Sequence, residues 1–133
     1  MHLILCVDDK DGMSFCGRRQ SRDREVAAHI LKLTHGCKLW VSPYTAQLFP
    51  AEAVCIHEDP QRMAGAGEFC FEEIRLCPDM EEKPESVIVY HWNRTYPSTE
   101  KFPRQVLAGM TLESTLEFSG YSHETVTMER YLP

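Results

Sequence analysis

Hydrophobic residues at the start of the chain form one short uninterrupted run and then recur at helical spacing. Residues 3–7 (Leu-Ile-Leu-Cys-Val) show no polar alternation, which is typical of a strand covered on both faces. Val26, Ile30 and Leu33 then recur on one side of a predicted helix over residues 21–34. The pattern predicts a central strand with this helix packed across it.

Further along, apolar runs alternate with short helical segments. Strands are predicted over residues 38–41, 53–56, 69–71 and 86–92, and helical turns over residues 42–49 and from Asp59-Pro60. This alternation predicts a largely parallel sheet. Residues 72–85, with two prolines and six acidic residues, are interpreted as a surface connection without a full helix. Strands over residues 111–118 and 125–131 are expected to form a closing antiparallel hairpin, which makes the sheet mixed.

Composition and charge exclude some classes of protein. The chain has 133 residues, 43% hydrophobic and 26% charged, and we expect one domain over residues 1–133. Its net charge of -6 opposes approach to nucleic acid or anionic lipid. Basic residues gather once, at Arg18, Arg19, Arg22 and Arg24, here named the arginine cluster.

Neither a membrane nor a metal is expected as a partner. The apolar run at residues 3–7 is too short to span a bilayer and lacks a preceding basic region, so we expect a cytoplasmic protein. The six cysteines form no C-x-x-C pair and are interpreted as reduced core thiols. His35, Cys37, Cys55 and His57 could supply zinc ligands, but their spacing matches no usual structural site. No metal is predicted, and the H-x-H-x-D-H cluster of a metallo-nuclease is absent from the sequence.

Asp23 is the main candidate for a chemical role. It lies on the first turn of the predicted helix, with Ser21 as the expected N-cap, where its carboxylate would face a cleft beside the central strand. One interpretation is a partly desolvated acid of raised pKa that supports protonation during hydride transfer. The other is an ordinary helix-start acid, favoured by the helix dipole. His91 and His123 have no serine or cysteine near them in sequence, and we expect them to be solvated or in the core.

The order of elements and several local strings resemble the dihydrofolate reductase family over most of the chain. The first strand with Gly12-Met13 resembles that family's first strand and the start of its active-site loop. Asp23 matches its pterin-binding carboxylate, Thr45 matches the threonine of its G-R-x-T motif, and residues 87–103 resemble its later strand and acidic loop. The resemblance implies an α/β fold with a mixed, mostly parallel twisted sheet, flanking helices and a C-terminal antiparallel hairpin.

The resemblance also implies the residues of a site. Asp23 would be the catalytic residue. Apart from the resemblance, Trp40, Trp92, Tyr90 and Phe102 are expected in the core or the pocket wall, since no basic residues interleave them. The ligand pocket would be lined by Val7, Gly12, Met13, Ala27, Thr45, Phe71 and Tyr90.

Three departures from the family's pattern concern its cofactor and substrate. Residues 18–20 (Arg-Arg-Gln) replace the proline-tryptophan pair of the first loop. Residues 42–44 (Ser-Pro-Tyr) replace the phosphate-gripping Gly-Arg, and the proline removes one backbone donor. Residues 72–73 (Glu-Glu) replace the glycine pair at the cofactor pyrophosphate and would repel it. The arginine that holds the folate tail has no clear counterpart. No cofactor is therefore expected, with NADPH as the alternative.

Three functions follow from these observations. The preferred one is a dihydrofolate reductase-like protein that acts as a non-reductase small-ligand or protein-binding module. The alternative is an active NAD(P)H-dependent reductase of a pterin-like substrate. The third, an anion or nucleic-acid binder through the arginine cluster, is disfavoured by the acidic remainder of the chain.

Overall fold

The computed structural model describes residues 1–77, 80 and 82–133. Its elements, in chain order, are β1 (His2–Val7), β2 (Gly12–Phe15), β3 (Arg18–Arg19), α1 (Arg24–Leu33), β4 (Leu39–Val41), α2 (Pro43–Ala46), η1 (Ala51–Ala53), β5 (Cys55–Ile56), α3 (Pro60–Met63), β6 (Phe69–Phe71), β7 (Ser86–His91), β8 (Glu100–Lys101), η2 (Arg104–Leu107), β9 (Thr111–Phe118) and β10 (Val126–Leu132).

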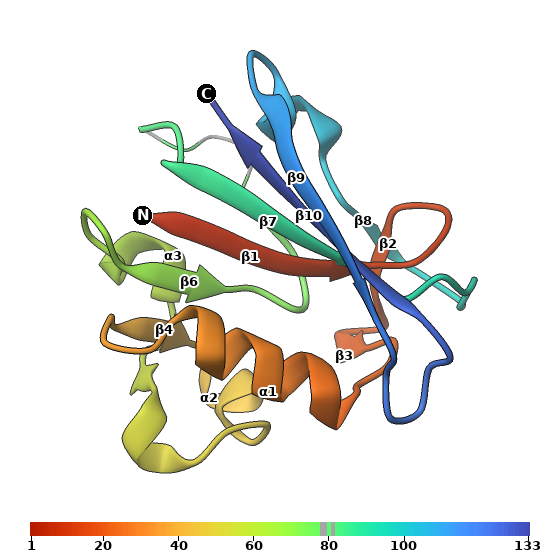
Figure 1. Ribbon diagram of the computed structural model, residues 1–133. Helices are drawn as coiled ribbons and strands as arrows, with labels where there is room; N and C mark the ends of the chain where they lie inside the picture. Colours follow the sequence, from red (N-terminus) through yellow and green to blue (C-terminus); the bar gives the residue numbers. More distant parts are fainter. Residues whose placement is uncertain (78–79, 81) are drawn as a thin grey trace.

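One seven-stranded sheet carries the fold, in the order β5-β4-β6-β1-β7-β10-β9. β1 lies in the middle, parallel to both β6 and β7, and β4 and β5 continue the parallel part. β10 is antiparallel to β7 and to β9, and α1 crosses one face of the sheet (Figure 1). The predicted mixed, mostly parallel sheet with a central first strand and a closing hairpin is confirmed.

The strand β1 is apolar throughout because both of its faces are covered. On one face Ile4 belongs to a core cluster with Val26 and Ile30 of α1. On the other face Leu5 belongs to a second cluster with Phe102, from the segment that follows β8. Successive side chains of a strand point to opposite faces, so the two clusters are separated by the sheet itself.

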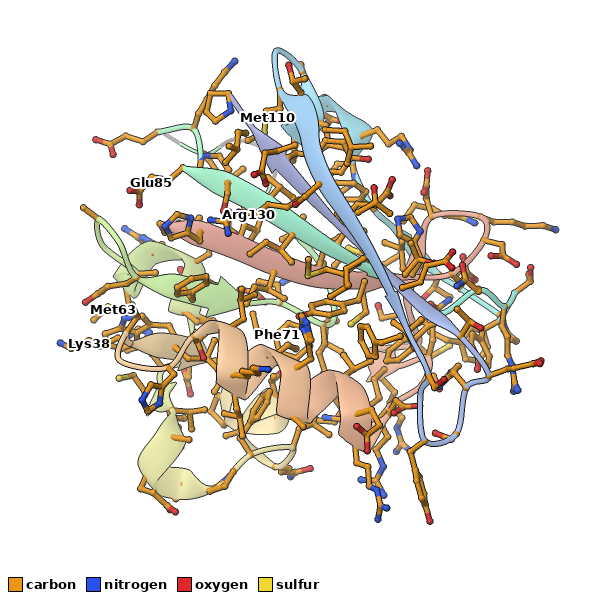
Figure 2. All side chains as sticks on the ribbon, viewed as in Figure 1. Lys38, Met63, Phe71, Glu85, Met110 and Arg130 are labelled. Carbon is orange, nitrogen blue, oxygen red and sulfur yellow. The ribbon has the colours of Figure 1, made fainter. Side chains whose placement is uncertain are left out.

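Side chains at the end of β6 are buried, whereas those at the border of the sheet are at the surface. Phe71, at the end of β6, is 3% exposed and lies in the interior beside α1, whereas Lys38 and Met63 lie at the periphery (Figure 2). The end of β6 therefore faces the same space as the first half of α1.

The helix α1 begins at Arg24, so the prediction of a start at Ser21 was wrong. Asp23 is the N-cap: its backbone is extended and its side chain accepts a hydrogen bond from the N–H of Glu25. The predicted apolar face is confirmed, because Val26 and Ile30 are both buried. At the next helix, α2 ends at Ala46 and is shorter than the predicted segment of residues 42–49.

A second, small sheet was not predicted. It has the order β3-β2-β8 and lies at the carboxyl end of β1 (Figure 1). The turn between β1 and β2 is held by the Asp8 carboxylate, which accepts from the N–H groups of Lys10 and Gly12 at 2.9 and 2.7 Å. A Cβ atom on Gly12 would lie 2.6 Å from Gln20 Nε2 and 2.8 Å from Ser98 Cβ. Only glycine therefore fits at this position.

The connection over residues 72–85 contains no helix in its described part, residues 72–77, 80 and 82–85. It is not wholly a surface segment, however, because Glu73 and Leu76 are buried. The predicted connection also includes Pro78, Asp79 and Glu81, which lie outside the described residues.

Candidate functional site

A cavity of about 410 Å³ lies between the first half of α1, the ends of β1 and β6, and the loop of the β9–β10 hairpin. Its apolar wall is formed by Cys6, Val26, Ile30, Phe49, Phe71 and Trp92. Polar side chains of Ser21, Arg22, Arg24, Glu73 and Ser122 also line it. Burial raises the pKa of the Cys6 thiol, and the Glu73 carboxylate adds to this effect, so the thiol stays protonated in the wall.

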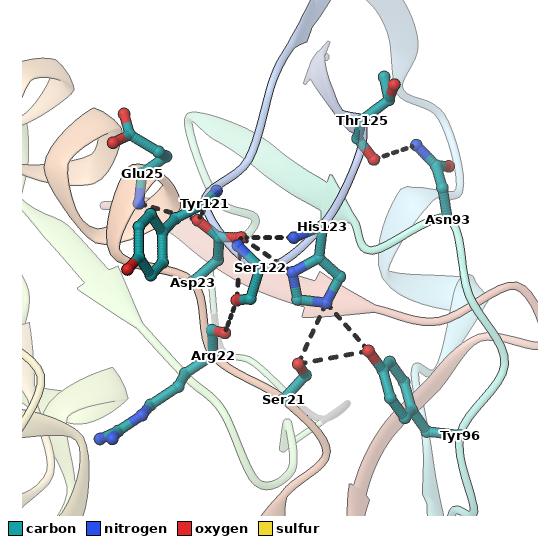
Figure 3. A network of polar contacts seen from close by, with 10 residues as sticks. All are labelled: Ser21, Arg22, Asp23, Glu25, Asn93, Tyr96, Tyr121, Ser122, His123 and Thr125. Atoms are coloured by element: carbon teal, nitrogen blue, oxygen red, sulfur yellow. Dashed lines mark hydrogen bonds and ion pairs between the residues drawn. The ribbon is translucent and has the colours of Figure 1, made fainter.

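Asp23 lies in the wall of this cavity, but its carboxylate is engaged within the protein (Figure 3). Oδ1 accepts from the N–H groups of Glu25 and Tyr121, both at 2.9 Å. Oδ2 accepts from the N–H groups of Ser122 and His123 at 2.9 and 3.1 Å, and from His123 Nδ1 at 2.9 Å. Burial disfavours the charged form, yet these hydrogen bonds outweigh it and hold the pKa of Asp23 below its usual value. The interpretation of Asp23 as an acid of raised pKa is therefore contradicted, and the geometry agrees with the other interpretation, a helix-start acid.

His123 joins Asp23 to two hydroxyl groups. Its Nε2 lies 3.1 Å from Ser21 Oγ and 3.0 Å from Tyr96 Oη, and these two hydroxyl oxygens are 3.4 Å apart (Figure 3). The His123 ring stacks on Trp92, with 4.6 Å between the ring centroids. The side chain of His123 is 1% exposed, so of the two expected states, solvated or core, it adopts the core state.

A second polar group lies around Glu73, which also lines the cavity. Its carboxylate accepts from Arg19 Nε and Nη2 at 2.8 and 2.9 Å, and from Thr45 Oγ1 at 2.9 Å. The Arg19 guanidinium also lies 4.1 Å from the centre of the Tyr44 ring. We name Arg19, Tyr44, Thr45 and Glu73 the Arg19–Glu73 cluster.

The neighbouring Glu72 is the one carboxylate among those described here whose pKa is shifted strongly upward. Burial and the nearby Asp59 raise the pKa of Glu72 from its ordinary value of 4.5 to about 7. The raised pKa shows that the surroundings of Glu72, at the end of β6, disfavour negative charge.

Of the predicted pocket residues, Ala27 and Phe71 line the cavity. Thr45 is buried, and its hydroxyl donates to Glu73 instead of facing the cavity. Tyr90 is also buried, and its hydroxyl lies 2.6 Å from His29 Nδ1.

Three further predicted positions lie elsewhere. Val7 and Met13 belong to the core cluster on the opposite face of the sheet, and Gly12 lies in the turn held by Asp8. Val7 does not line this cavity, whereas Cys6, the preceding residue of the strand, does, because successive side chains point to opposite faces.

The arginine cluster does not act as one surface. Arg19 is paired with Glu73, and the Arg24 guanidinium lies 3.7 Å from the centre of the Tyr121 ring. Arg22 and Arg24 both line the cavity, so positive charge lies beside the apolar wall.

Searches for metal and membrane features give negative results for the part of the chain that the structure describes. Within residues 1–77, 80 and 82–133, no three histidine, cysteine or acidic side chains gather so as to hold a metal ion. No helix among the same residues has the length and apolar character needed to cross a bilayer.

Of three comparisons with known proteins, the one with solved structures bears on the fold. No protein-family model matches the chain, and no curated protein sequence matches it. Among solved structures, the chain is similar to dihydrofolate reductase from Enterococcus faecalis complexed with NADP(H) and RAB-propyl, with a TM-score of 0.67. The two share 10% sequence identity, and the match covers 98% of this chain and 94% of the other. The chain has the dihydrofolate reductase-like fold that its local strings imply.

Proposed function

We propose that this protein is a small-ligand-binding module with a dihydrofolate reductase-like fold, and that it does not use NADPH in the family's manner. The ligand would occupy the cavity of about 410 Å³ beside α1, a volume within the usual range for small-molecule sites.

The observation that carries this proposal is the Arg19–Glu73 cluster. The family resemblance places a cofactor pyrophosphate near Thr45 and the end of β6, but the Thr45 hydroxyl already donates to the Glu73 carboxylate at 2.9 Å. That carboxylate is 7% exposed and carries negative charge balanced by Arg19. An anionic diphosphate would meet a like charge here and find its donors in use, so these residues do not fit the group.

Asp23 supports the same conclusion for a pterin. A carboxylate that binds a pterin must accept hydrogen bonds from the ligand, whereas both oxygens of Asp23 already accept from Glu25, Tyr121, Ser122 and His123. The Asp23 side chain is also fully buried. A ligand could reach it only after the hairpin loop had moved.

The cavity itself favours one class of ligand. Its wall is apolar and contains the rings of Phe49, Phe71 and Trp92, which suit a flat apolar or aromatic body. Arg22 and Arg24 add positive charge at the same cavity, which would attract a carboxylate or sulfonate. We therefore expect a small aromatic or apolar acid.

Calorimetric titration with NADPH at low salt tests the exclusion of the cofactor. Each charge-assisted hydrogen bond to a phosphate contributes about 1.5–3 kcal/mol, so the loss of three would weaken a micromolar complex to beyond about 1 mM. A silent titration is expected. Micromolar binding with dihydrofolate reduction would instead establish the alternative, an active reductase.

Fluorescence titration with 8-anilinonaphthalene-1-sulfonate, an aromatic anion, tests ligand binding in the cavity. Saturable binding to the folded protein is expected, together with its loss in Ala27→Trp, because Ala27 lines the cavity. Ala28→Trp is the matched control, since Ala28 is the next residue of α1 and is exposed. Equal binding by both variants would show that the dye occupies another surface.

A further inference from the structure

Ser21, His123 and Asp23 are arranged in the order of a nucleophile, a base and a positioning acid. Ser21 Oγ lies 3.1 Å from His123 Nε2, and His123 Nδ1 lies 2.9 Å from Asp23 Oδ2. We propose that this triad hydrolyses small carboxylic esters that enter the cavity, with Ser21 as the nucleophile. The inference rests on the proposed function in one respect, namely that the cavity admits a small molecule.

The hydrogen bonds fix the tautomer that such a reaction needs. Asp23 Oδ2 already accepts from two backbone N–H groups and offers only an acceptor to the imidazole. The proton of the neutral His123 ring therefore lies on Nδ1, and Nε2 is the acceptor that faces the hydroxyl groups of Ser21 and Tyr96. This division of roles is the one by which a histidine activates a serine.

The base is held rigidly in a dry environment. His123 stacks on Trp92 at an interplanar angle of 23°, and the side chains of His123 and Asp23 are 1% and 0% exposed. The preceding loop packs tightly against both: a Cβ atom on Gly120 would lie 2.6 Å from the carbonyl oxygen of His123 and 2.7 Å from Asp23 Oδ2. A base fixed in this way loses little entropy when the reaction proceeds.

The nucleophile, in contrast, is accessible. Ser21 is partly exposed and lines the cavity. The Tyr96 hydroxyl lies 3.4 Å from Ser21 Oγ, beside the nucleophile. Arg22 and Arg24, which line the same cavity, provide positive charge for the acyl oxyanion.

The reaction balances with water as the only co-reactant. Ser21 Oγ forms a bond to the acyl carbon while its proton passes to His123 Nε2. The carbon–oxygen bond to the alcohol then breaks, and the departing alkoxide takes the proton from Nε2. Water next attacks the acyl-serine with His123 as the base, which releases the carboxylic acid and restores the Ser21 hydroxyl.

Labelling with a fluorophosphonate probe, followed by peptide mass spectrometry, tests the nucleophile directly. One adduct on Ser21 is expected, together with hydrolysis of p-nitrophenyl acetate. Ser21→Ala should abolish both signals and His123→Gln should lower both by about 10²–10⁴-fold. Ser114→Ala should leave both unchanged, because Ser114 is an exposed residue of β9 that hydrogen-bonds its neighbour Glu113.

Asp23→Asn tests the positioning acid separately from folding. Asparagine also caps helices, so the variant should keep a cooperative thermal transition, at a lower melting temperature because an amide NH2 replaces one of the two oxygens that accept from backbone N–H groups. The expected result is a fall in kcat by more than about 10²-fold with KM unchanged, since the ring loses its fixed tautomer. If kcat/KM fell by the same factor because KM rose while kcat stayed unchanged, the positioning role would be overturned.

The failure of this inference can be told apart from the failure of the proposed function. Binding of the anilinonaphthalene probe without any adduct on Ser21 would overturn the triad and leave the binding module intact. The absence of both signals would overturn both proposals. An adduct on a serine other than Ser21 would also overturn the triad.

Discussion

Arg19 donates two hydrogen bonds to Glu73, at 2.8 and 2.9 Å, across a separation of 54 residues in the chain. Arg19 belongs to the substituted first loop and Glu73 to the substituted end of β6. Tyr44, from the third substituted string, packs against the same guanidinium at 4.1 Å. The three departures from the family's pattern are therefore one structural unit, in which an internal ion pair lies where the resemblance places a diphosphate.

Breaking this pair should destabilise the protein strongly. The Arg19 and Glu73 side chains are 15% and 6% exposed, so Arg19→Ala leaves a buried carboxylate without its cation. We expect the free energy of unfolding in urea to fall by about 3–5 kcal/mol. Arg18→Ala, at the exposed neighbouring position, should change it by less than about 0.5 kcal/mol. The double variant Arg19→Met with Glu73→Leu should recover most of the loss, and an undamaged Arg19→Ala protein would contradict the prediction.

Removing the Asp23 carboxylate should cost more than an ordinary helix cap. Asp23→Ala deletes the N-cap, worth about 0.5–2 kcal/mol, and also leaves buried donors of the hairpin loop without a partner, at about 1–3 kcal/mol. We expect a total loss of at least about 2 kcal/mol, measured by chemical denaturation. Glu25→Ala, an exposed first-turn acid, is the control and should cost only a few tenths of a kcal/mol. Equal effects of the two variants would show that the hairpin contacts contribute nothing.

Glu72 should make stability depend on pH near neutrality. Its pKa is about 7 in the folded protein against an ordinary value of 4.5, so the folded state binds the proton more tightly than the unfolded state. Stability should therefore fall as the pH rises from about 4.5 to about 7 and level off above that. Glu72→Gln should remove this slope and raise stability at pH 8 by about 1–3 kcal/mol relative to the wild type. Melting temperatures across this range measure the effect, and Glu58→Gln, at an exposed position, should keep the wild-type slope.

The core position Ile30 should tolerate truncation poorly. Ile30 is 0% exposed and packs between α1 and the sheet, so Ile30→Ala should cost about 2–5 kcal/mol through the cavity that it leaves. Leu116→Ala on β9, where the side chain is 45% exposed, should cost less than about 1 kcal/mol. A loss under 1 kcal/mol for Ile30→Ala would show that this face of α1 is not the core face.

Elements with a strong hydrophobic period could be predicted from the sequence. The apolar run of β1 and the recurring Val26 and Ile30 of α1 identify the centre of the fold, because burial on both faces of a strand and on one face of a helix leaves a local pattern. The small sheet β3-β2-β8 produces no such hydrophobic pattern in the sequence. Two of its strands have only two residues each and are held by backbone pairing. Its strands were therefore missed.

The site was harder to predict because its contacts are not local. Asp23 was singled out correctly as a helix-start acid, but its partners Tyr121, Ser122 and His123 lie 98 to 100 residues away. No spacing rule connects Ser21 to His123. The place of Cys6 in the cavity wall, in contrast, could have been predicted from the sequence. Cys6 alternates with Val7 along the strand and lies on the same face as Ile4.

Asp23, the N-cap of α1, is held by a loop that lies much later in the chain, and this arrangement affects how the protein folds during synthesis. Strand β1 pairs with β7 at a sequence separation of 84 residues, as between His2 and Ser86. The hairpin loop that contacts Asp23 lies at a similarly large separation from it. Contacts of such high contact order form slowly, since a long stretch of chain must be closed before any of them is gained. During synthesis the apolar strand β1 must therefore remain without its second neighbouring strand until β7 has left the ribosome. The hairpin that completes the cavity wall is also the last part of the fold that can form.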